Sequence, residues 1–239
     1  ESGDVVMPSG RDEYLFYQTL IGVWPLAENN GDVPGLEVVA ALRMRLAAYM
    51  VKAAREAKMH TSWLNPDEEY ENALTGFVDQ VLDGPAAIPF LRDVQSFVRR
   101  LEGPGICNAL AQMVLRLTIP GVPDTYQGTE LWDDSLVDPD NRRPVDFGIR
   151  RTYLRDFRRM GPASDHKAFL HTLRTNRISG RIKQYLLWRL LHLRLEIPEV
   201  FIRGSYGPLM IEGDRAAHVL AFVRVLGDRI VLVAVPRLT

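Results

Sequence analysis

"GVPDTYQG", residues 121–128, is the stretch that decides the fold class of this chain. Its centre, residues 122–127, is short, compatible with β-structure and bracketed by Gly121 and Gly128. An apolar helical pattern over residues 106–118 precedes it and stops at Pro120. A helix that leads into a buried strand is typical of parallel α/β architectures, in which ligands gather beyond the carboxyl ends of strands. We therefore expect a strand at 122–127, with functional side chains after it.

The polar segment "SLVDPDNRRPVDF", residues 135–147, follows that strand and fits neither a helix nor a strand pattern. It holds three aspartates, two adjacent arginines and two prolines. Two interpretations stay open: the acids and bases neutralise one another as a structural clasp, or they bind a polar ligand such as a sugar. They are compatible, because arginines that lock the loop would also hold its other hydrogen-bonding groups in place.

Residues 12–120 read mainly as helices. Apolar side chains recur at steps of three and four and predict one buried helix face, made by Val39, Leu42, Leu46, Tyr49, Met50, Ala53 and Ala57. The opposite face is basic, with Arg43, Arg45, Lys52, Arg55 and Lys58, and we interpret it as solvated rather than as an anion site. Asn65-Pro66-Asp67-Glu68 predicts a helix start capped by Asn65, and Gly103-Pro104-Gly105 is expected to break a later helix.

After the loop, the spacing of hydrophobic residues changes from a helical to a strand-like pattern near residue 197. A basic segment at 150–159, a helix capped by Asp165 and a long helix capped by Ser179 are expected first, the last one between two layers. "VFIRG", "PLMIEG", "HVLAFVRV" and "RIVLVAV" then read as strands of a small antiparallel β domain. The expected fold class is α+β and largely helical, with domains at 1–120 (helical), 121–197 (strand, polar loop and closing helices) and 198–239 (part of the β domain).

Composition narrows the function classes. The chain has 239 residues, 46% of them hydrophobic, and a formal charge of -1, so it offers no overall attraction to nucleic acid or an anionic membrane. The lone Cys107 can form no internal disulfide, and apolar runs are too short to span a bilayer, which favours a cytoplasmic protein. No phosphate loop, metal cluster or nucleophile elbow is visible, so we expect neither a cofactor nor a metal.

The remaining polar and aromatic side chains suit a carbohydrate, because aromatic rings cover the apolar faces of a sugar while carboxylates, amides and guanidinium groups bind its hydroxyls. His60 is included because it follows a helix and precedes Trp63 in a loop, although a plain surface histidine is the alternative. The predicted substrate-binding residues are Tyr126, Gln127, Glu130, Asp138, Asp140, Asn141, Arg142, Arg143, His60 and Trp63.

Four stretches together resemble the maltooligosyltrehalose synthases of the α-amylase superfamily: "RDEYLFYQTLIGVWP", "KMHTSWLNPDEEYE", "PGVPDTYQGTELWDDSLVDPDNRRPVDF" and "GRIKQYLLWR". The resemblance spans nearly the whole chain in the right order. It implies a (β/α)8 barrel enzyme, an isomerase that turns the reducing-end α-1,4 link of a maltodextrin into the α,α-1,1 link of trehalose by intramolecular transglucosylation.

The resemblance also implies what this chain lacks. The three catalytic carboxylates of the superfamily precede the matching segment, and the expected Thr-His-Asp-Thr-Lys-Arg stretch is absent. We therefore expect a carboxy-proximal fragment that binds sugar, contains no catalytic residue and needs the missing part of its own barrel as partner. A non-catalytic glucan-binding or structural helical module, and part of a hydrolytic relative, stay open as alternatives. The role of Lys183 in "GRIKQYLLWR" also stays open.

Overall fold

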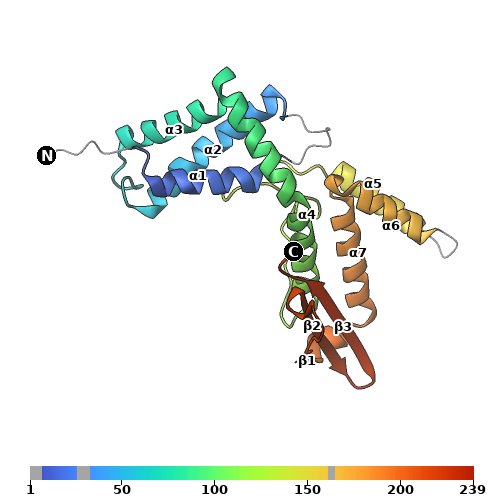
Figure 1. Ribbon diagram of the computed structural model, residues 1–239. Coiled ribbons are helices and arrows are strands. Elements are labelled where there is room, and N and C mark those ends of the chain that lie inside the picture. The colour runs from blue at the N-terminus through green and yellow to red at the C-terminus, as the bar shows by residue number, and fades with distance from the viewer. Residues whose placement is uncertain (1–6, 26–32, 161–164) are drawn as a thin grey trace. The chain divides into compact units, whose positions relative to one another are not determined.

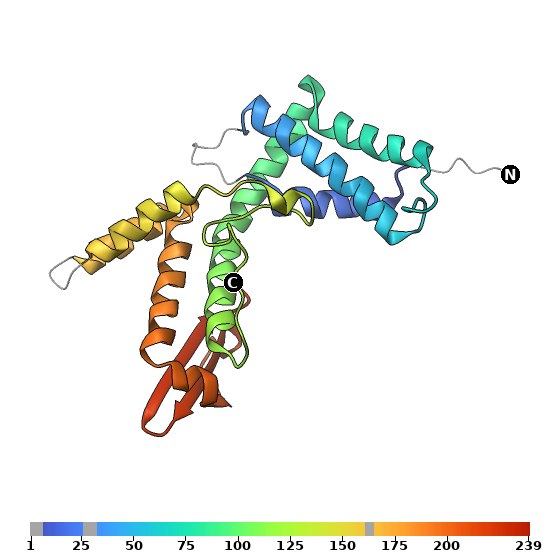
Figure 2. The same ribbon diagram turned by 180° about the vertical axis from the view of Figure 1, so that it is seen from behind.

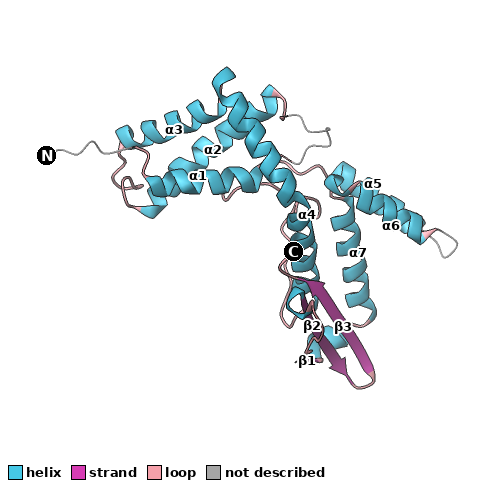
Figure 3. Cartoon of the chain, in the orientation of Figure 1, coloured by secondary structure: helices cyan, strands magenta, loops and turns pink. Residues whose placement is uncertain are grey.

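The computed structural model describes residues 7–25, 33–160 and 165–239 (Figure 1). These residues form a largely helical fold with a small antiparallel sheet, as the sequence predicted (Figure 3). The helices are α1 Gly10–Val23, α2 Leu36–Ala57, α3 Glu68–Leu82, α4 Ile88–Thr118, α5 Phe147–Arg159, α6 His166–Thr175, α7 Arg181–Glu196 and α8 Pro198–Arg203. The strands are β1 Ser205–Pro208, β2 Val219–Leu226 and β3 Arg229–Pro236.

The chain divides into two compact units, and the polar loop is shared between them. The first unit comprises residues 1–100 and 134–143, and the second comprises residues 101–133 and 144–239. The expected domain limits near 120 and 197 stay predictions.

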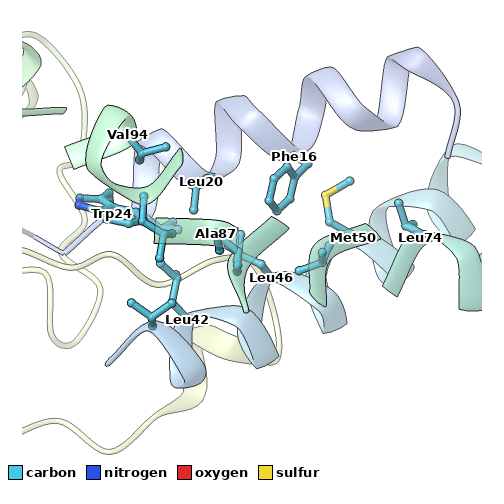
Figure 4. Packing of buried hydrophobic residues seen from close by; sticks show 14 of the residues in the cluster. Phe16, Leu20, Trp24, Leu42, Leu46, Met50, Leu74, Ala87 and Val94 are labelled. Carbon is cyan, nitrogen blue, oxygen red and sulfur yellow. The ribbon is translucent and has the colours of Figure 1, made fainter. Parts of the chain in front are cut away.

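Helices α1, α2 and α3 lie side by side in the first unit (Figure 2). Their apolar faces form its core, in which Phe16, Leu46 and Leu74 are fully buried (Figure 4). Phe16 meets Phe77 edge to face, with 5.1 Å between the ring centroids. The predicted face of α2 is confirmed at Val39, Leu42, Leu46 and Met50. Periodicity at 3.6 residues thus located most of the buried face of α2, although Ala57 is exposed and Ala54 is buried instead.

The start of α3 differs from the prediction by two residues. Asp67, not Asn65, is the N-cap, and its Oδ1 accepts a hydrogen bond of 3.0 Å from the Tyr70 amide. Asn65 instead closes a turn, since its amide donates to Ser62 Oγ and its carbonyl accepts from the Ser62 amide. A carboxylate three residues before a free amide is the better cap once Asn65 is engaged in that turn.

Helix α4 continues through Pro104, so the predicted break at Gly103-Pro104-Gly105 is wrong. A proline inside a helix removes the hydrogen bond to the carbonyl four residues earlier, here that of Arg100, and its ring crowds that carbonyl. A helix can accommodate both effects by a kink and continue. The boundary between the two units also falls after Arg100. The sequence signal therefore marked a real discontinuity, but one of packing rather than of secondary structure.

No strand forms at residues 122–127, so the strand predicted there is wrong. A strand needs a neighbour to accept and donate its backbone hydrogen bonds, and among the described residues the paired strands are β1, β2 and β3. Residues 200–203, expected as a strand, belong to the short helix α8 because Pro198 starts that helix at its first position.

The antiparallel sheet of the second unit has the order β1-β2-β3, which confirms the last two predicted strands. A two-residue turn with Gly227 at φ 61° joins Leu226 to Arg229.

The second half of α4 packs one face on this sheet through Ala111 and its other face on α7 through Met113 and Leu117. Helix α7 itself is open on part of its surface, since Leu195 is 78% exposed. Its N-cap is Gly180 rather than Ser179, whereas the Asp165 cap of α6 is confirmed.

Arg224 of β2 is the largest fully buried side chain among the described residues. Its guanidinium donates to four backbone carbonyls, those of Thr118 at the end of α4, Phe201 and Gly204 at the end of α8, and Ser205 of β1. The last carbonyls of a helix have no partner inside the helix and carry partial negative charge. Arg224 therefore ties two helix ends to the sheet.

Candidate functional site: the ion-paired polar loop

Arg45 on α2 makes the most contacts with the residues that begin the polar loop. Its Nε and Nη2 donate to the Asp140 carboxylate at 3.0 and 2.9 Å, and its Nη1 and Nη2 donate to Asp134 Oδ2 and the Asp134 carbonyl at 3.2 and 2.6 Å. Arg143 adds a second bridge, from Nη2 to Asp134 Oδ1 at 3.2 Å. We call Arg45, Asp134, Asp140 and Arg143 the loop clasp. A planar guanidinium with several donors is suited to such a multiple contact.

The charge on Asp140 is stabilised by this arrangement. Burial by itself would raise the pKa of this carboxyl, but hydrogen bonds from Arg45 and from the Leu136 amide, 2.7 Å from Oδ2, leave the pKa below its ordinary value. For Arg45, burial would lower the pKa, and the bonds from both carboxylates raise it instead. Both groups are therefore charged at neutral pH, and the clasp interpretation of the loop is confirmed.

The other loop charges are more exposed. Arg142 pairs with Asp138 four residues earlier, and their side chains are 71% and 51% exposed. Lys52 of α2 donates to the Asp138 carbonyl. Exposed pairs of this kind contribute little stability, so these groups are available to a ligand at small cost. The Asn141 Oδ1 is buried and accepts no hydrogen bond from the described residues.

His60 and Trp63 lie in a loop of the first unit that a buried carboxylate fixes. Glu71 accepts two bonds from Arg55, at 2.8 and 2.6 Å, and one from Thr61 Oγ1 at 2.6 Å. The bonds from Arg55 lower the pKa of Glu71. The Arg55 guanidinium also lies over the Trp63 ring, 4.9 Å from its centroid, and Trp63 stays 57% exposed. An exposed aromatic face held in place is suited to stacking on a sugar ring.

In the second unit, Glu130 joins the start of α5 to a turn. Its Oε2 accepts from Arg150 Nε at 2.9 Å and from the Gly128 amide at 3.0 Å, and Arg150 Nη2 donates to the Gly128 carbonyl at 2.5 Å. Tyr126 and Gln127 lie next to this turn, and both are exposed. The structure thus gives Glu130 a scaffolding contact and leaves Tyr126 and Gln127 open to solvent.

Lys183 lies beside Trp132 in the same unit. Its Nζ donates to the Leu131 carbonyl at 2.8 Å and lies 5.3 Å from the centroid of the Trp132 ring, whose Nε1 donates to the Arg177 carbonyl. Burial lowers the pKa of Lys183, with Asp133 the largest opposing influence. The sequence did not assign a role to this lysine. In the structure its contacts join α7 to residues 131–132.

The predicted residues fall in two groups that follow the two units. His60, Trp63, Asp138, Asp140, Asn141, Arg142 and Arg143 belong to the first unit, and Tyr126, Gln127 and Glu130 belong to the second. Within the first, the contacts join the loop charges to α2. In the ranges that the structure describes, no three His, Cys, Asp or Glu side chains are arranged to hold a metal ion, and no helix has the length and apolarity to cross a membrane.

Sequence reasoning missed the basic face of α2. Arg45 and Lys52 bond to loop residues, and Arg43 and Arg55 pair with acids of α3 or its C-cap, namely Asp79, Asp83 and Glu71. The interpretation of this face as solvated is therefore wrong at these positions. The available signal was that its cations recur at helical spacing while the polar loop carries acids that need partners.

A substitution at Gly180 tests how closely residues 131–132 pack against the start of α7. Gly180 has φ +74°, and an added Cβ would lie 2.9 Å from the Trp132 amide nitrogen and 3.1 Å from Leu131 Cβ. We expect Gly180→Ala to lower the free energy of unfolding by about 2 kcal/mol, from left-handed strain plus overpacking. Gly84 is the matched control, with φ +76° and no atom within 4 Å of the added Cβ. Gly84→Ala should cost about 1 kcal/mol. Equal losses in hydrogen-exchange protection for the two variants would contradict the close packing.

The fold and the ion-paired loop define a class: a helical segment with a small antiparallel sheet that recurs inside several larger synthases of known structure. Those synthases are maltooligosyltrehalose synthases. One, described as "Crystal Structure of Maltooligosyl trehalose synthase", superposes with a TM-score of 0.73 and 32% identity, over 94% of this chain and 27% of that chain. The enzyme from Arthrobacter ramosus gives a TM-score of 0.68 and 34% identity, over 95% of this chain and 25% of its own.

A sequence relative agrees with the structural ones. A protein of Mycobacterium tuberculosis strains CDC 1551 and H37Rv, named "Putative maltooligosyl trehalose synthase", is 45% identical over 232 residues, 97% of this chain. The chain spans about a quarter of the length of these relatives, 26% for the mycobacterial protein. No family model matches the chain. The resemblance predicted from the four motifs is therefore confirmed along nearly the whole chain.

Proposed function

We propose that this chain is the sugar-positioning segment of a maltooligosyltrehalose synthase. The observation that carries the proposal is the 45% identity over 97% of the chain, together with the shared fold. The whole enzyme would convert the reducing-end α-1,4 link of a maltodextrin into an α,α-1,1 link, as an isomerase of the α-amylase superfamily built on a (β/α)8 barrel. The free Cys107 thiol is consistent with a cytoplasmic location.

The covalent chemistry would lie outside this segment. Retaining glycosyl transfer needs a nucleophilic carboxylate and an acid about 5 Å apart across the scissile bond. The clasp acids do not fit that role, because Asp140 is held as a charged partner of Arg45 and Asp134 is bonded to both Arg45 and Arg143. We therefore assign no catalytic residue to this chain.

The polar loop would contribute rigidity and hydroxyl recognition. Isomerisation is faster than hydrolysis only if two conditions hold. The released glucose must be held in the site while it reorients, and water must be kept from the glucosyl intermediate. A loop fixed to α2 by the clasp and limited by Pro139 and Pro144 loses less entropy when it binds a sugar. Arg142 and Asp138, whose side chains are exposed, would then bind hydroxyl groups.

A chimera tests the proposal. The 239 residues of this chain would replace the matching quarter of the Mycobacterium tuberculosis relative. The chimera is expected to convert maltopentaose to a trehalose-terminated product at a rate within about tenfold of the parent. The inserted segment would hold the sugar as the parent's own segment does, and so preserve the transition-state geometry. Arg142→Ala in the chimera should lower the ratio of trehalose-terminated product to released glucose.

Two outcomes would reject this function. A chimera that melts like the parent yet only hydrolyses maltopentaose would place the chain in a hydrolytic enzyme. Trehalose-terminated product from the 239-residue chain alone would contradict the assignment of the chemistry to another part. Calorimetry of the chain alone with maltotriose, with and without Arg142→Ala, separates a simple glucan-binding module from an enzyme segment.

A further inference from the structure

A small hollow in the first unit lies apart from the loop clasp. It has a volume of about 160 Å³ and is lined by Ser9, Arg11, Asp12, Ala54, Ala57, Met59 and His60. These residues come from the start of α1, the end of α2 and the loop that follows α2. No residue of the polar loop lines it. With about 30 Å³ for each water of the liquid, it has room for about five waters, so it suits a single small ring rather than a chain of rings.

Asp12 brings a buried carboxylate to this hollow. The residue is 7% exposed, and its Oδ2 accepts hydrogen bonds from Ser9 Oγ at 3.1 Å and from Tyr70 Oη. The second oxygen, Oδ1, accepts no hydrogen bond from any residue that the structure describes. Asp12 lines the hollow, so a carboxylate oxygen of this largely buried residue can still accept a hydrogen bond there. This oxygen suits a ligand that carries hydroxyl donors.

His60 and Arg11 offer further polar groups. The His60 ring stacks on the buried Tyr70 ring, with centroids 4.4 Å apart and planes at 19°, so its orientation is fixed. Within the described ranges, neither His60 nitrogen and no Arg11 nitrogen makes a hydrogen bond or ion pair. Tyr70 thus positions both the carboxylate and the imidazole. Polar groups held by a buried neighbour are preorganised for binding.

The rest of the lining is apolar. Ala54, Ala57 and Met59 add methyl groups and a thioether to a lining that also holds the carboxylate, guanidinium and imidazole. A pyranose has the same division, with C–H groups on its faces and hydroxyl groups around its rim. We propose that this hollow binds one glucosyl unit of an α-glucan, as a contact separate from the polar loop. This inference rests on the proposed function for the identity of the sugar, whereas the hollow and its unpaired groups do not depend on it.

Titration of the isotope-labelled chain with methyl α-glucoside, followed by amide shifts in NMR, tests the site. We expect saturable shifts at residues 9–12 and 57–60, with a dissociation constant in the millimolar range, about 1 mM. His60→Phe keeps the ring on Tyr70 but removes both nitrogens, and Ala57→Leu fills the hollow. Each should weaken binding at least tenfold. Glu56→Leu adds the same side chain one position away, outside the lining, and should leave the affinity unchanged.

Three results would overturn this site. One is the absence of saturable shifts at residues 9–12 and 57–60. Another is glucoside binding that Arg142→Ala abolishes and Ala57→Leu does not, which leaves the proposed function standing and moves the sugar to the loop. The third is saturation of the hollow by glycine or inorganic phosphate but not by the glucoside. Conversely, an inactive chimera with an intact glucoside response at the hollow would reject the proposed function alone.

Discussion

Replacement of Arg224 by methionine is expected to lower the free energy of unfolding of the second unit by about 3–5 kcal/mol. The guanidinium is 1% exposed and donates to four carbonyls, three of them 3.0 Å away. Methionine fills much of the volume but donates no hydrogen bond, so the carbonyls of Thr118, Phe201 and Gly204 would be left in the interior without this donor. The cost of such groups, rather than the lost attraction itself, dominates the effect.

Hydrogen exchange followed by mass spectrometry measures this loss where it occurs. Peptides from β2 and β3 should lose protection, while peptides from α1 to α3 in the first unit should not change. Arg203→Met is the matched control, because the Arg203 side chain is 72% exposed and its ion pair among the described residues is with Glu199. It should change stability by less than about 0.5 kcal/mol. Similar effects of the two substitutions would show that the carbonyl contacts contribute no special stability.

Removal of Arg45 is expected to release the polar loop from α2 and to destabilise the first unit by about 2–3 kcal/mol at neutral pH. Arg45→Met leaves Asp140, whose side chain is 15% exposed, without the guanidinium that holds it charged. Arg43→Met provides a control on the same helix, since the partners of Arg43 are carboxylates 58% and 69% exposed. That control should cost less than about 1 kcal/mol.

The pH dependence distinguishes an electrostatic clasp from simple packing. The pKa of Asp140 is lower in the folded chain than in the unfolded chain, so its contribution is fully present above the ordinary carboxyl pKa of about 4 and is lost as the pH falls further. The stability difference between wild type and Arg45→Met should therefore shrink as the pH is lowered below about 4. Urea denaturation at several pH values measures it. A difference that stays constant on acidification would mean that Arg45 acts through its aliphatic stem.

The sequence was informative wherever a local pattern is sufficient. The apolar positions of α2, the Asp165 cap of α6 and the hairpin of β2 and β3 follow from spacing, capping and turn chemistry over a few residues. The four motifs also led to the relatives that sequence and structure comparison then supplied. The sequence pattern was misleading at residues 122–127 and at Pro104. Strand pairing and helix continuation depend on the segments that pack beside them in the folded chain.

The residues alone thus established the helical class, the resemblance to the synthases and the polar, irregular character of residues 135–146. Tertiary structure alone decided which charges pair, since Arg45 meets Asp140 across 95 positions and Arg224 meets Thr118 across 106. The same holds for the hollow, in which Tyr70 joins Asp12 and His60. Electrostatic and hydrogen-bonding partners are chosen by distance in space, and spacing along the chain carries no record of that distance once it exceeds a few helical turns.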